Sequence, residues 1–503
     1  MDRMRPLDAG FLDLEDEDRH SSLAIASVAV FEGPAPTYDE FLAAIAAKLP
    51  LIPRYRQKVR QVPLDLSTPV WVDDPQFDLR YHVRQTALPT PGGDEQLRHL
   101  MERVMGQRLD RERPLWEYWL VEGLEGGRWA WISKVHHCMV DGVSGTDLYR
   151  VLLDPAPEPS SPPVEDHWHP APEPSTLRLT ATALRELALS PVQQARALRA
   201  ALRAPGQVAR RVVGTARGLA TMAGALVPTS ASSLSGPIGR PRRYRWARAS
   251  MADVKAVREQ FGGTVNDVGL AAVSGAFRAL LLERGEQPGP HVIRSLVPVS
   301  VRAPGEEGIY ENRVSLLLAY LPVDIADPVE RLSAVREQLA TLKASGEAEA
   351  GAAMTQLAGY EPFPLVSLGL RLAFRMPQRN IITVTTNVPG PRRPLYAMGR
   401  RLVEILPYVP IATTVRFSVS MFTYCDQMTF GITGDRDSAA DIDVLTRAIE
   451  DGLAELVRAA ERGSRRARRA RKPVAGQPRA VTTNGDHGIR QRQRRGDPSS
   501  SRG

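Results

Sequence analysis

Strand-like and helical stretches follow one another in the first third of the chain. Strand-like runs, rich in β-branched, aromatic or alternating apolar residues, cover residues 22–31 and 129–132. Helical runs, with apolar residues three and four positions apart, cover residues 38–48, 97–109 and 146–153. This alternation predicts an α/β domain over residues 1–153.

The same two patterns return in the second half of the chain. Strand-like runs cover residues 292–301, 314–323, 381–388, 413–420 and 428–433. Helical runs cover residues 250–258, with Ser250 as the expected cap, and then residues 268–282 and 444–460. We therefore expect a second α/β domain with a sheet of its own over residues 244–460.

A segment of different composition separates the two halves. Residues 154–163 and 170–174 are rich in proline, which is typical of an extended linker. Residues 182–204 and 208–227 then have helical character. The sequence therefore predicts a Pro-rich and then helical linker over residues 154–243.

One face of the first linker helix is basic. Arg196, Arg199 and Arg203 lie three and four positions apart, so they share that face, while Leu198 and Leu202 lie on another. Such a helix can lie on an anionic membrane or lipid surface, or it can pack on the two domains. Both interpretations remain open at this stage.

The charge of the chain lies mostly outside the predicted domains. The net charge is +8, of which residues 176–248 carry +12 and residues 461–503 carry +10, leaving −14 for the remainder. Residues 461–503 have no aromatic and few aliphatic residues, so we expect a disordered basic tail. Nucleic-acid binding by such a tail would be nonspecific at most, so no specific nucleic-acid partner is expected.

The cysteine content and the hydropathy pattern indicate a cytoplasmic protein that contacts membranes peripherally. Cys138 and Cys425 are the only cysteines, so no disulfide framework is expected and a reducing compartment is favoured. The N-terminal residues run into the acidic segment 13–18, which is unlike a signal peptide. The sequence contains no uninterrupted apolar stretch of about 18 residues, so we expect no membrane-spanning helix.

The strongest candidate for chemistry lies where the strand that begins at Trp129 ends. His136 and His137 stand there side by side, and Asp141 and Gly142 follow in the next turn. A histidine near its ordinary pKa can accept a hydroxyl proton during attack on a carbonyl and then protonate the leaving group. The aspartate and the flexible glycine can hold the loop in shape. This pattern favours an acyl transfer.

Two other interpretations fit this segment. His-x-x-x-Asp spacing also supplies zinc ligands, but the other close histidine pair, His167 and His169, lies in the Pro-rich linker. The residues could also be hydrogen-bonded polar groups at a strand end. The spacing favours catalysis without a metal.

Several motifs, taken together, resemble the bacterial wax ester synthase/diacylglycerol acyltransferase family. His136-His137-x-x-x-Asp141-Gly142 is similar to the signature of the CoA-dependent acyltransferase superfamily, which includes nonribosomal-peptide condensation domains. Further matches are Leu109-Asp110-Arg111, Arg113-Pro114-Leu115-Trp116-Glu117, Val265-Asn266-Asp267-Val268, Pro298-Val299-Ser300-Val301-Arg302 and Thr386-Asn387-Val388-Pro389-Gly390-Pro391. They occur in the family's order.

This resemblance implies a reaction and roles for particular residues. The reaction is esterification of a long-chain acyl-CoA onto diacylglycerol or a fatty alcohol, by direct transfer with His137 as general base. His136 would pack or orient the loop, and Asp141 would pair with an arginine, for which Arg302 is the suggested partner. Asn266 would donate to the oxyanion or orient the acceptor. Other expected site residues are Gly142, Asp267, Pro114, Leu115 and Trp116.

The resemblance also implies an architecture and a set of partners. Two similar CoA-dependent-acyltransferase-like domains with mixed sheets would surround a central cleft, joined by the long helical linker. The substrates would be acyl-CoA and a lipid alcohol, with no metal or cofactor, and the protein would associate peripherally with the inner membrane face or lipid droplets. The alternatives are a condensation-domain-like acyl or peptidyl transferase and a noncatalytic lipid-droplet surface protein.

Overall fold

The computed structural model describes residues 2–139, 145–158, 166–186, 188, 232–300, 314–344 and 381–471. The chain divides into two units, residues 1–460 and residues 461–503. The arginine face of the first predicted linker helix, residues 196–203, lies outside the described residues.

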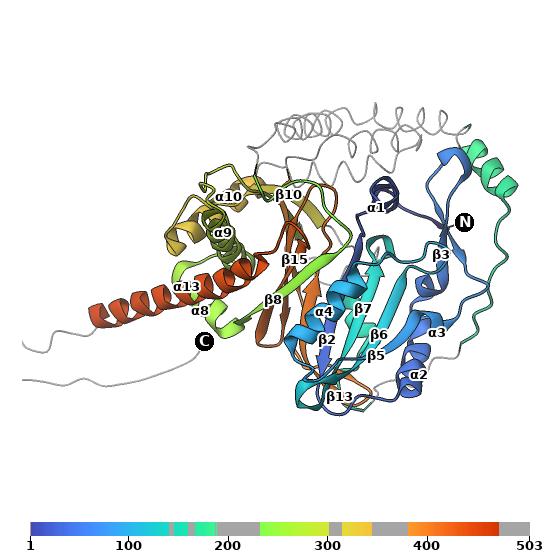
Figure 1. Ribbon diagram of the computed structural model, residues 1–503, viewed down its shortest axis with the longest axis horizontal. Coiled ribbons are helices and arrows are strands. Elements are labelled where there is room, and N and C mark those ends of the chain that lie inside the picture. The colour runs from blue at the N-terminus through green and yellow to red at the C-terminus, as the bar shows by residue number, and fades with distance from the viewer. Residues whose placement is uncertain are drawn as a thin grey trace, which may run out of the picture. The chain divides into compact units, whose positions relative to one another are not determined.

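A six-stranded mixed sheet is the centre of the N-terminal half (Figure 1). Its strands, in spatial order, are β12 (Tyr396–Ala397), β13 (Arg400–Tyr408), β2 (Ala24–Phe31), β7 (Arg128–His136), β6 (Trp116–Leu124) and β5 (Val83–Ala87). Neighbouring strands are antiparallel except β5 and β6, which are parallel. A small antiparallel sheet of β1 (Asp2–Arg3), β4 (Val70–Asp73) and β3 (Gln57–Arg60) accompanies it.

A second six-stranded mixed sheet is the centre of the C-terminal half. Its order is β10 (Val314–Tyr320), β9 (Arg294–Ser300), β11 (Thr383–Pro389), β14 (Phe417–Tyr424), β15 (Gln427–Asp435) and β8 (Arg242–Ser250). Strand β11 runs parallel to both of its neighbours, and the other pairs are antiparallel. The expected fold class, two similar α/β domains with mixed sheets, is confirmed.

Helices cover the two sheets. The N-terminal half has α1 (Pro6–Glu17), α2 (Tyr38–Lys48), α3 (Leu79–His82), α4 (Asp94–Met105) and α5 (Gly145–Leu152). The C-terminal half has α8 (Met251–Phe261), α9 (Val265–Glu283), α10 (Pro328–Ala344) and α13 (Ile442–Arg471). The Ser250 side chain accepts a hydrogen bond from the Ala252 amide, which confirms this residue as the cap of α8.

Two of the strands that were not predicted from the sequence, β13 and β8, connect the halves of the chain. Strand β13 comes late in the chain, yet it pairs with β2 and completes the N-terminal sheet. Strand β8 begins at Arg242, within the predicted linker, and continues into the predicted second domain, and arginines occupy many of its positions. In the folded protein Arg245 and Arg248 form ion pairs with buried or partly buried carboxylates, so their charge is compatible with a strand.

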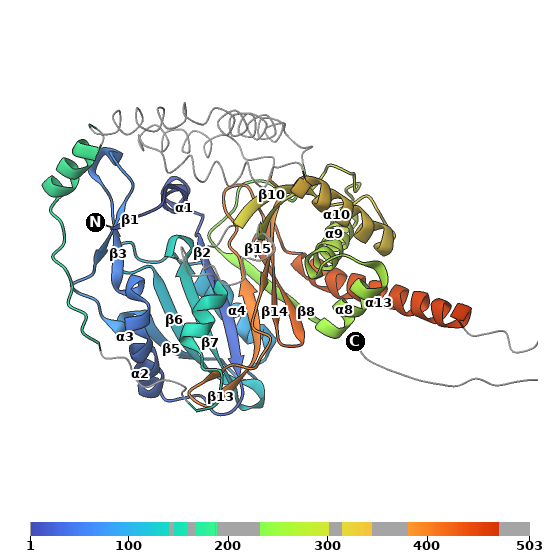
Figure 2. The ribbon, with the colours of Figure 1, turned by 180° about the vertical axis from the view of Figure 1, so that it is seen from behind.

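The two sheets approach closely where β13 crosses β15 (Figure 2). A Cβ atom added at Gly431 would lie 1.7 Å from the Pro407 carbonyl oxygen, so only glycine fits there. The Tyr244 hydroxyl donates to the same carbonyl at 2.8 Å. Arg248 of β8 bridges to Glu404 of β13 at 2.8 Å. These contacts fix the two sheets against each other.

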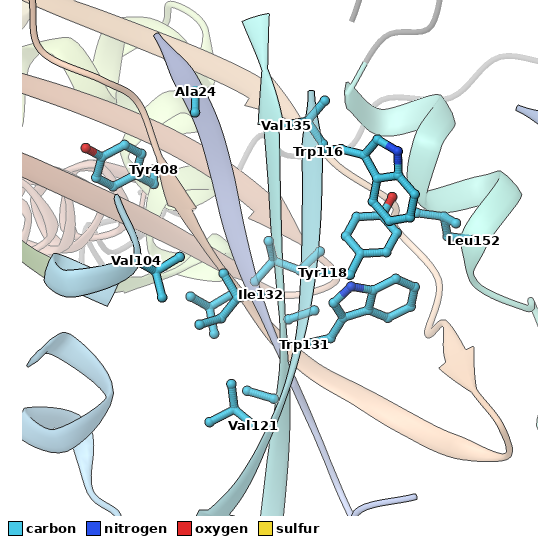
Figure 3. Close-up of a cluster of buried hydrophobic side chains, with 14 of the residues drawn as sticks. Ala24, Val104, Trp116, Tyr118, Val121, Trp131, Ile132, Val135, Leu152 and Tyr408 are labelled. Atoms are coloured by element: carbon cyan, nitrogen blue, oxygen red, sulfur yellow. The ribbon is translucent and has the colours of Figure 1, made fainter. Parts of the chain in front are cut away.

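Large aromatic side chains fill the core of the first sheet. Trp116, Tyr118 and Trp131 follow one another along one face, whereas Val121 and Ile132 project from the other (Figure 3). The rings of Tyr118 and Trp131 meet edge to face with centroids 5.0 Å apart. Because strand residues alternate between faces, β6 and β7 contribute to both sides of the sheet. The packing holds the end of β7 in one position.

Helix α9 is long and apolar enough to cross a membrane by length and composition, with a mean hydropathy of 1.4. Among the described helices it alone meets this criterion. Of its most apolar 18-residue stretch, 67% is buried inside the protein. It packs against α8 and α10, as a core helix does.

The closing helix differs in length from the expectation. Helix α13 does not end at Ala460 but continues to Arg471, into the segment for which we expected disorder. The composition of this segment predicts that it has no hydrophobic core of its own. Alanine and arginine are nevertheless both good helix formers, so the same composition favours a helix there. Residues 472–503 lie outside the described residues.

Candidate active site

The two histidines lie at the end of a central strand, as predicted. His136 is the last residue of β7 and pairs with Ala24 of β2. Its amide donates to the Leu115 carbonyl at 2.9 Å, and the His137 amide donates to the Leu23 carbonyl at 3.1 Å. His137 then begins a 3-10 turn, η5 (His137–Met139). Backbone bonds to both sides therefore fix the start of the turn.

The ring of His136 is buried, with the Cys138 amide at Nδ1 and the Glu15 carboxylate close to Nε2. The Cys138 amide donates to Nδ1 at 3.3 Å, so Nδ1 carries no proton and the neutral ring is protonated at Nε2. Nε2 lies 3.3 Å from Oε1 of Glu15. Burial lowers the pKa of His136, although the Glu15 carboxylate opposes this. His136 is thus held as a neutral ring directed at Glu15.

Glu15 is a buried carboxylate on α1, and it connects three segments. Its Oε1 accepts from the Leu23 amide at 2.6 Å, and its Oε2 accepts from Arg111 at 2.9 Å. Burial opposes ionisation, but the His136 and Arg111 contacts and the Leu23 hydrogen bond outweigh it and lower the pKa of Glu15 to about 2. Glu15 is therefore ionised at neutral pH.

Two arginines from one short segment hold α1 in place. Arg108 donates to the Ser21 carbonyl at 2.9 Å and to the Glu15 and Asp18 carbonyls, near the C-terminal end of the helix. A cation is favourable at this end because the last carbonyls of a helix lack intrahelical partners. Arg111 contacts Glu15, as described above, and also the Leu12 carbonyl at 3.2 Å. The Leu109-Asp110-Arg111 motif thus anchors the helix that contacts both histidines.

His137 has a more open environment than His136. Its side chain is partly exposed, and its ring packs on Phe11 of α1 with centroids 4.2 Å apart. Desolvation, followed by the neighbouring His136 ring, lowers the pKa of His137 to about 4. The imidazole is therefore neutral near pH 7, which is the form that can accept a proton.

Residues Pro114, Leu115 and Trp116 lie behind the histidine pair. All three are buried, and the Leu115 carbonyl accepts from the His136 amide. The Trp116 ring stacks on Tyr55 with centroids 4.7 Å apart, and its Nε1 donates to the Tyr55 carbonyl at 2.8 Å. The motif packs against the site, and its proposed contact with substrate stays a prediction.

Asn266 and Asp267 lie in the first turn of α9, but neither is the helix cap. Thr264 caps the helix, because its hydroxyl accepts from the Asp267 amide at 3.2 Å and the Asp267 carboxylate accepts from the Thr264 amide at 2.7 Å. This reciprocal capping box occupies the Asp267 carboxylate, whose expected role in substrate binding stays a prediction. Asn266 is partly exposed, and its role as donor stays a prediction.

Three of the predicted residues lie outside the described ranges: Asp141, Gly142 and Arg302. Their proposed roles therefore stay predictions. Among the residues that the structure describes, no group of three or more His, Cys, Asp or Glu side chains could hold a metal ion.

Sequence reasoning missed Glu15, Phe11 and Arg111 as neighbours of the histidine pair. A signal for Glu15 exists, because Asp8, Leu12 and Glu15 recur at helical spacing on the buried face of α1. A carboxylate on such a face needs a buried partner. Phe11 and Glu15 are one helical turn apart, so they reach the adjacent rings of His137 and His136 from one helix face.

Family models match most of the chain. The model of the wax ester synthase/diacylglycerol acyltransferase (WS/DGAT) catalytic domain matches residues 4–269, and that of the WS/DGAT C-terminal domain matches residues 310–457.

Named relatives are similar over nearly their whole length. The probable diacylglycerol O-acyltransferase tgs1 of Mycobacterium tuberculosis is 43% identical over 92% of this chain and 97% of its own. The putative diacylglycerol O-acyltransferase Rv3371 of the same organism is 34% identical over 91% of each chain.

Solved structures agree in fold. The wax ester synthase/diacylglycerol acyltransferase from Marinobacter aquaeolei VT8 has a TM-score of 0.62 and 26% identity, covering 91% of this chain and all of that one. A second structure is the starter condensation domain of rhizomide synthetase RzmA, a double mutant in complex with C8-CoA and Leu-SNAC. Its TM-score is 0.54 at 14% identity, and the match covers 90% of this chain and 94% of that one. The second likeness is one of fold alone.

Proposed function

Because the chain belongs to the wax ester synthase/diacylglycerol acyltransferase family, we propose that it esterifies diacylglycerol with a long-chain acyl group from acyl-CoA. The chain is an acyltransferase of lipid biosynthesis, and the proposal concerns its preferred acceptor and the residues that carry the reaction. We choose diacylglycerol as the acceptor because the chain is 43% identical to a probable diacylglycerol O-acyltransferase over 97% of that protein.

The proposed mechanism is a direct transfer with His137 as the base. Its neutral imidazole accepts the proton of the acceptor hydroxyl while that oxygen attacks the thioester carbonyl. The tetrahedral intermediate then collapses, the carbon–sulfur bond breaks, and the imidazolium protonates the CoA thiolate. General acid–base catalysis of this kind contributes roughly 10²–10⁴-fold in rate. The reaction needs no metal or cofactor, since acyl-CoA is a substrate.

In this proposal the surrounding residues position the base. Glu15 and the Cys138 amide hold His136, and His136 in turn fixes the backbone at which His137 begins its turn. Asp141, paired with an arginine, would shape the loop after the turn. Asn266 would donate to the oxyanion, a role that typically contributes on the order of 10²–10³-fold to kcat.

A panel of acceptors tests the proposed function. With palmitoyl-CoA as donor, we expect CoA release to be faster with diolein than with hexadecanol, and triacylglycerol to be the lipid product. CoA release that depends on a carrier-protein acceptor and not on either lipid would instead support a condensation-type transferase. A purified chain that binds lipid but releases no CoA with any acceptor would favour the surface-protein alternative.

We further propose that the protein acts at the inner membrane face or at lipid droplets, because its acceptor is a lipid. The helix predicted from the sequence around Arg196, Arg199 and Arg203 would supply a basic surface, and each basic residue near an anionic surface contributes about 1 kcal/mol. Changing all three to Glu should markedly reduce sedimentation with phosphatidylglycerol vesicles at physiological salt. Unchanged sedimentation would show that these helices pack on the protein.

A further inference from the structure

A cavity of about 560 Å³ with an unusual number of arginines lies between α4 and β8. The two elements lie side by side in Figure 1, although they come from different halves of the chain. The lining contains six arginines and one carboxylate: Arg103, Arg240, Arg242, Arg243, Arg245, Arg436 and Glu102, with His99, Gly106, Gln107 and Pro241. The cavity is therefore strongly basic.

Two of the six arginines are occupied by the protein. Arg245 pairs with Glu102 at 3.0 Å and with Asp443 at 2.7 Å. Arg242 is almost completely buried, and it donates to the Gly239 carbonyl and, at 2.6 Å, to the His20 carbonyl. The one carboxylate in the lining is thus neutralised by Arg245.

The other four arginines leave an excess of positive charge. Arg243 donates to the Arg436 carbonyl at 2.8 Å, which does not compensate its charge. Arg103, Arg240 and Arg436 are exposed, and in the part of the chain that the structure describes none of the four forms an ion pair with a carboxylate. Like charges around one cavity repel, so an anion that binds there is stabilised.

The cavity is connected to the histidine turn through two short paths. The Gln107 carbonyl, at the cavity wall, accepts from the buried Lys134 at 2.7 Å, and Lys134 lies two residues before His136 on β7. Arg242 holds the His20 carbonyl, and the same segment provides the Leu23 carbonyl that accepts from the His137 amide. The cavity and the catalytic turn thus share their supporting backbone.

We propose that this cavity binds phosphate esters, and specifically the phosphate groups at the nucleotide end of acyl-CoA. The proposal rests on the function proposed above. Acyl-CoA carries a ribose phosphate and a diphosphate, separated from the thioester by the long pantetheine arm. A site for the phosphates is therefore expected away from His137, whereas the thioester must reach it.

The chemistry and the size of the cavity agree with such a ligand. One guanidinium group can donate two parallel hydrogen bonds to phosphate oxygens. Such charge-assisted hydrogen bonds are stronger than those between neutral groups. Four arginines that form no ion pair with a carboxylate among the described residues match a ligand with several phosphate charges. The volume of about 560 Å³ lies within the range of roughly 300–1,000 Å³ that is usual for small-molecule sites. A phospholipid headgroup offers the same phosphate chemistry, so the experiment must separate the two sources.

Steady-state kinetics with two donors tests the proposal. The triple variant Arg103→Glu, Arg240→Glu and Arg436→Glu changes exposed side chains, so it is expected to fold. Its KM for palmitoyl-CoA should rise about tenfold or more, because charge-assisted bonds are lost and repulsion replaces them. Its kcat should stay within about twofold, and its KM for palmitoyl-pantetheine, which lacks the nucleotide, should not change.

A matched control changes the same charge elsewhere. Lys255→Glu, Lys343→Glu and Arg458→Glu alter three exposed residues outside the cavity and should leave the KM for palmitoyl-CoA unchanged. An equal rise in the control, or a rise for palmitoyl-pantetheine as well, would overturn the proposal. So would an unchanged KM for palmitoyl-CoA in the cavity variant.

Direct binding separates the phosphate sources and does not depend on acyl transfer. Adenosine 3′,5′-bisphosphate should bind the wild-type protein in calorimetry and bind the triple variant at least about tenfold more weakly. If the variant instead binds the nucleotide normally but loses sedimentation with phosphatidylglycerol vesicles, the cavity takes headgroups and the proposal is wrong. A wild-type protein that binds the nucleotide but transfers no acyl group would contradict the proposed function and leave this site supported.

Discussion

Replacing His137 with alanine is expected to lower kcat/KM for palmitoyl-CoA and diolein by about two to four orders of magnitude. The neutral ring is removed, so no group at the end of β7 accepts the hydroxyl proton or protonates the thiolate. The side chain is partly exposed and its described ring contact is with Phe11, so the variant should remain folded. CoA release and the melting temperature would be measured together.

The neighbouring histidine provides the control. His136→Gln should retain more activity than His137→Ala, because His136 orients the turn and does not touch the reacting atoms. It should also lower stability, since the buried Glu15 loses one partner. A His137→Ala protein that keeps wild-type activity, or a His136→Gln protein that is inactive while folded, would overturn the assignment of the base.

The pH profile gives a second measure of the same assignment. Because the pKa of His137 is lowered to about 4, its imidazole is already neutral at pH 6. The value of kcat/KM should therefore stay level from about pH 8 to pH 6 and fall only as the pH approaches 4. A midpoint near the ordinary histidine pKa of about 6.5 would contradict the desolvation that lowers the pKa of this ring.

Replacing Glu15 with alanine is expected to destabilise the protein by about 1–3 kcal/mol, the cost of leaving buried hydrogen-bonding groups without their partner. The change leaves Arg111 and the buried His136 without their shared carboxylate and the Leu23 amide without its acceptor. Denaturant unfolding would measure the loss. Glu17→Ala, at an exposed position of the same helix, should change stability by less than about 0.5 kcal/mol.

Acid unfolding should report the same carboxylate. The pKa of Glu15 is lowered from 4.5 to about 2 in the folded protein, so its contribution to stability is present above pH 4.5 and lost as the pH falls toward 2. A shift of this size corresponds to about 3 kcal/mol. Glu15→Gln should remove this part of the pH dependence while keeping an acceptor for the Leu23 amide. An unchanged acid transition would show that the carboxylate is not ionised in the folded state.

Activity separates a positioning role for Glu15 from a purely structural one. If Glu15 positions the turn through His136, Glu15→Gln should lower kcat more than it raises KM at a temperature where the protein is folded. If Glu15→Gln lowers stability but leaves kcat unchanged, Glu15 stabilises the fold and does not position the catalytic turn.

Local patterns in the sequence predicted the elements that present the histidines. The helix expected over residues 38–48 is α2, with the same bounds. The strand that begins near Trp129 ends at His136, and the chain turns at His137 as expected. These features depend on spacing and capping within a few residues, so a single sequence contains them.

Long-range partners could not be predicted in this way. Strand β13 joins the N-terminal sheet from the far end of the chain, and nothing within Arg400–Tyr408 specifies β2 as its neighbour. The contact of Glu15 with Arg111 spans 96 positions, although Arg111 belongs to a motif that is visible in the sequence. Such pairings are chosen by how the sheets pack and not by local propensity.

The sequence by itself therefore determined the types of the elements with clear periodicity, the strand end that carries His136 and His137, and, through its motifs, the family. The tertiary structure decided which groups surround the two histidines and where the arginines of the predicted linker lie. Arg240, Arg242 and Arg243 were counted as part of a basic linker, yet folding places them at one cavity with Arg103 of α4. The physical reason is that periodicity shows which face of an element is buried, whereas the identity of the buried partner depends on every other element that packs there.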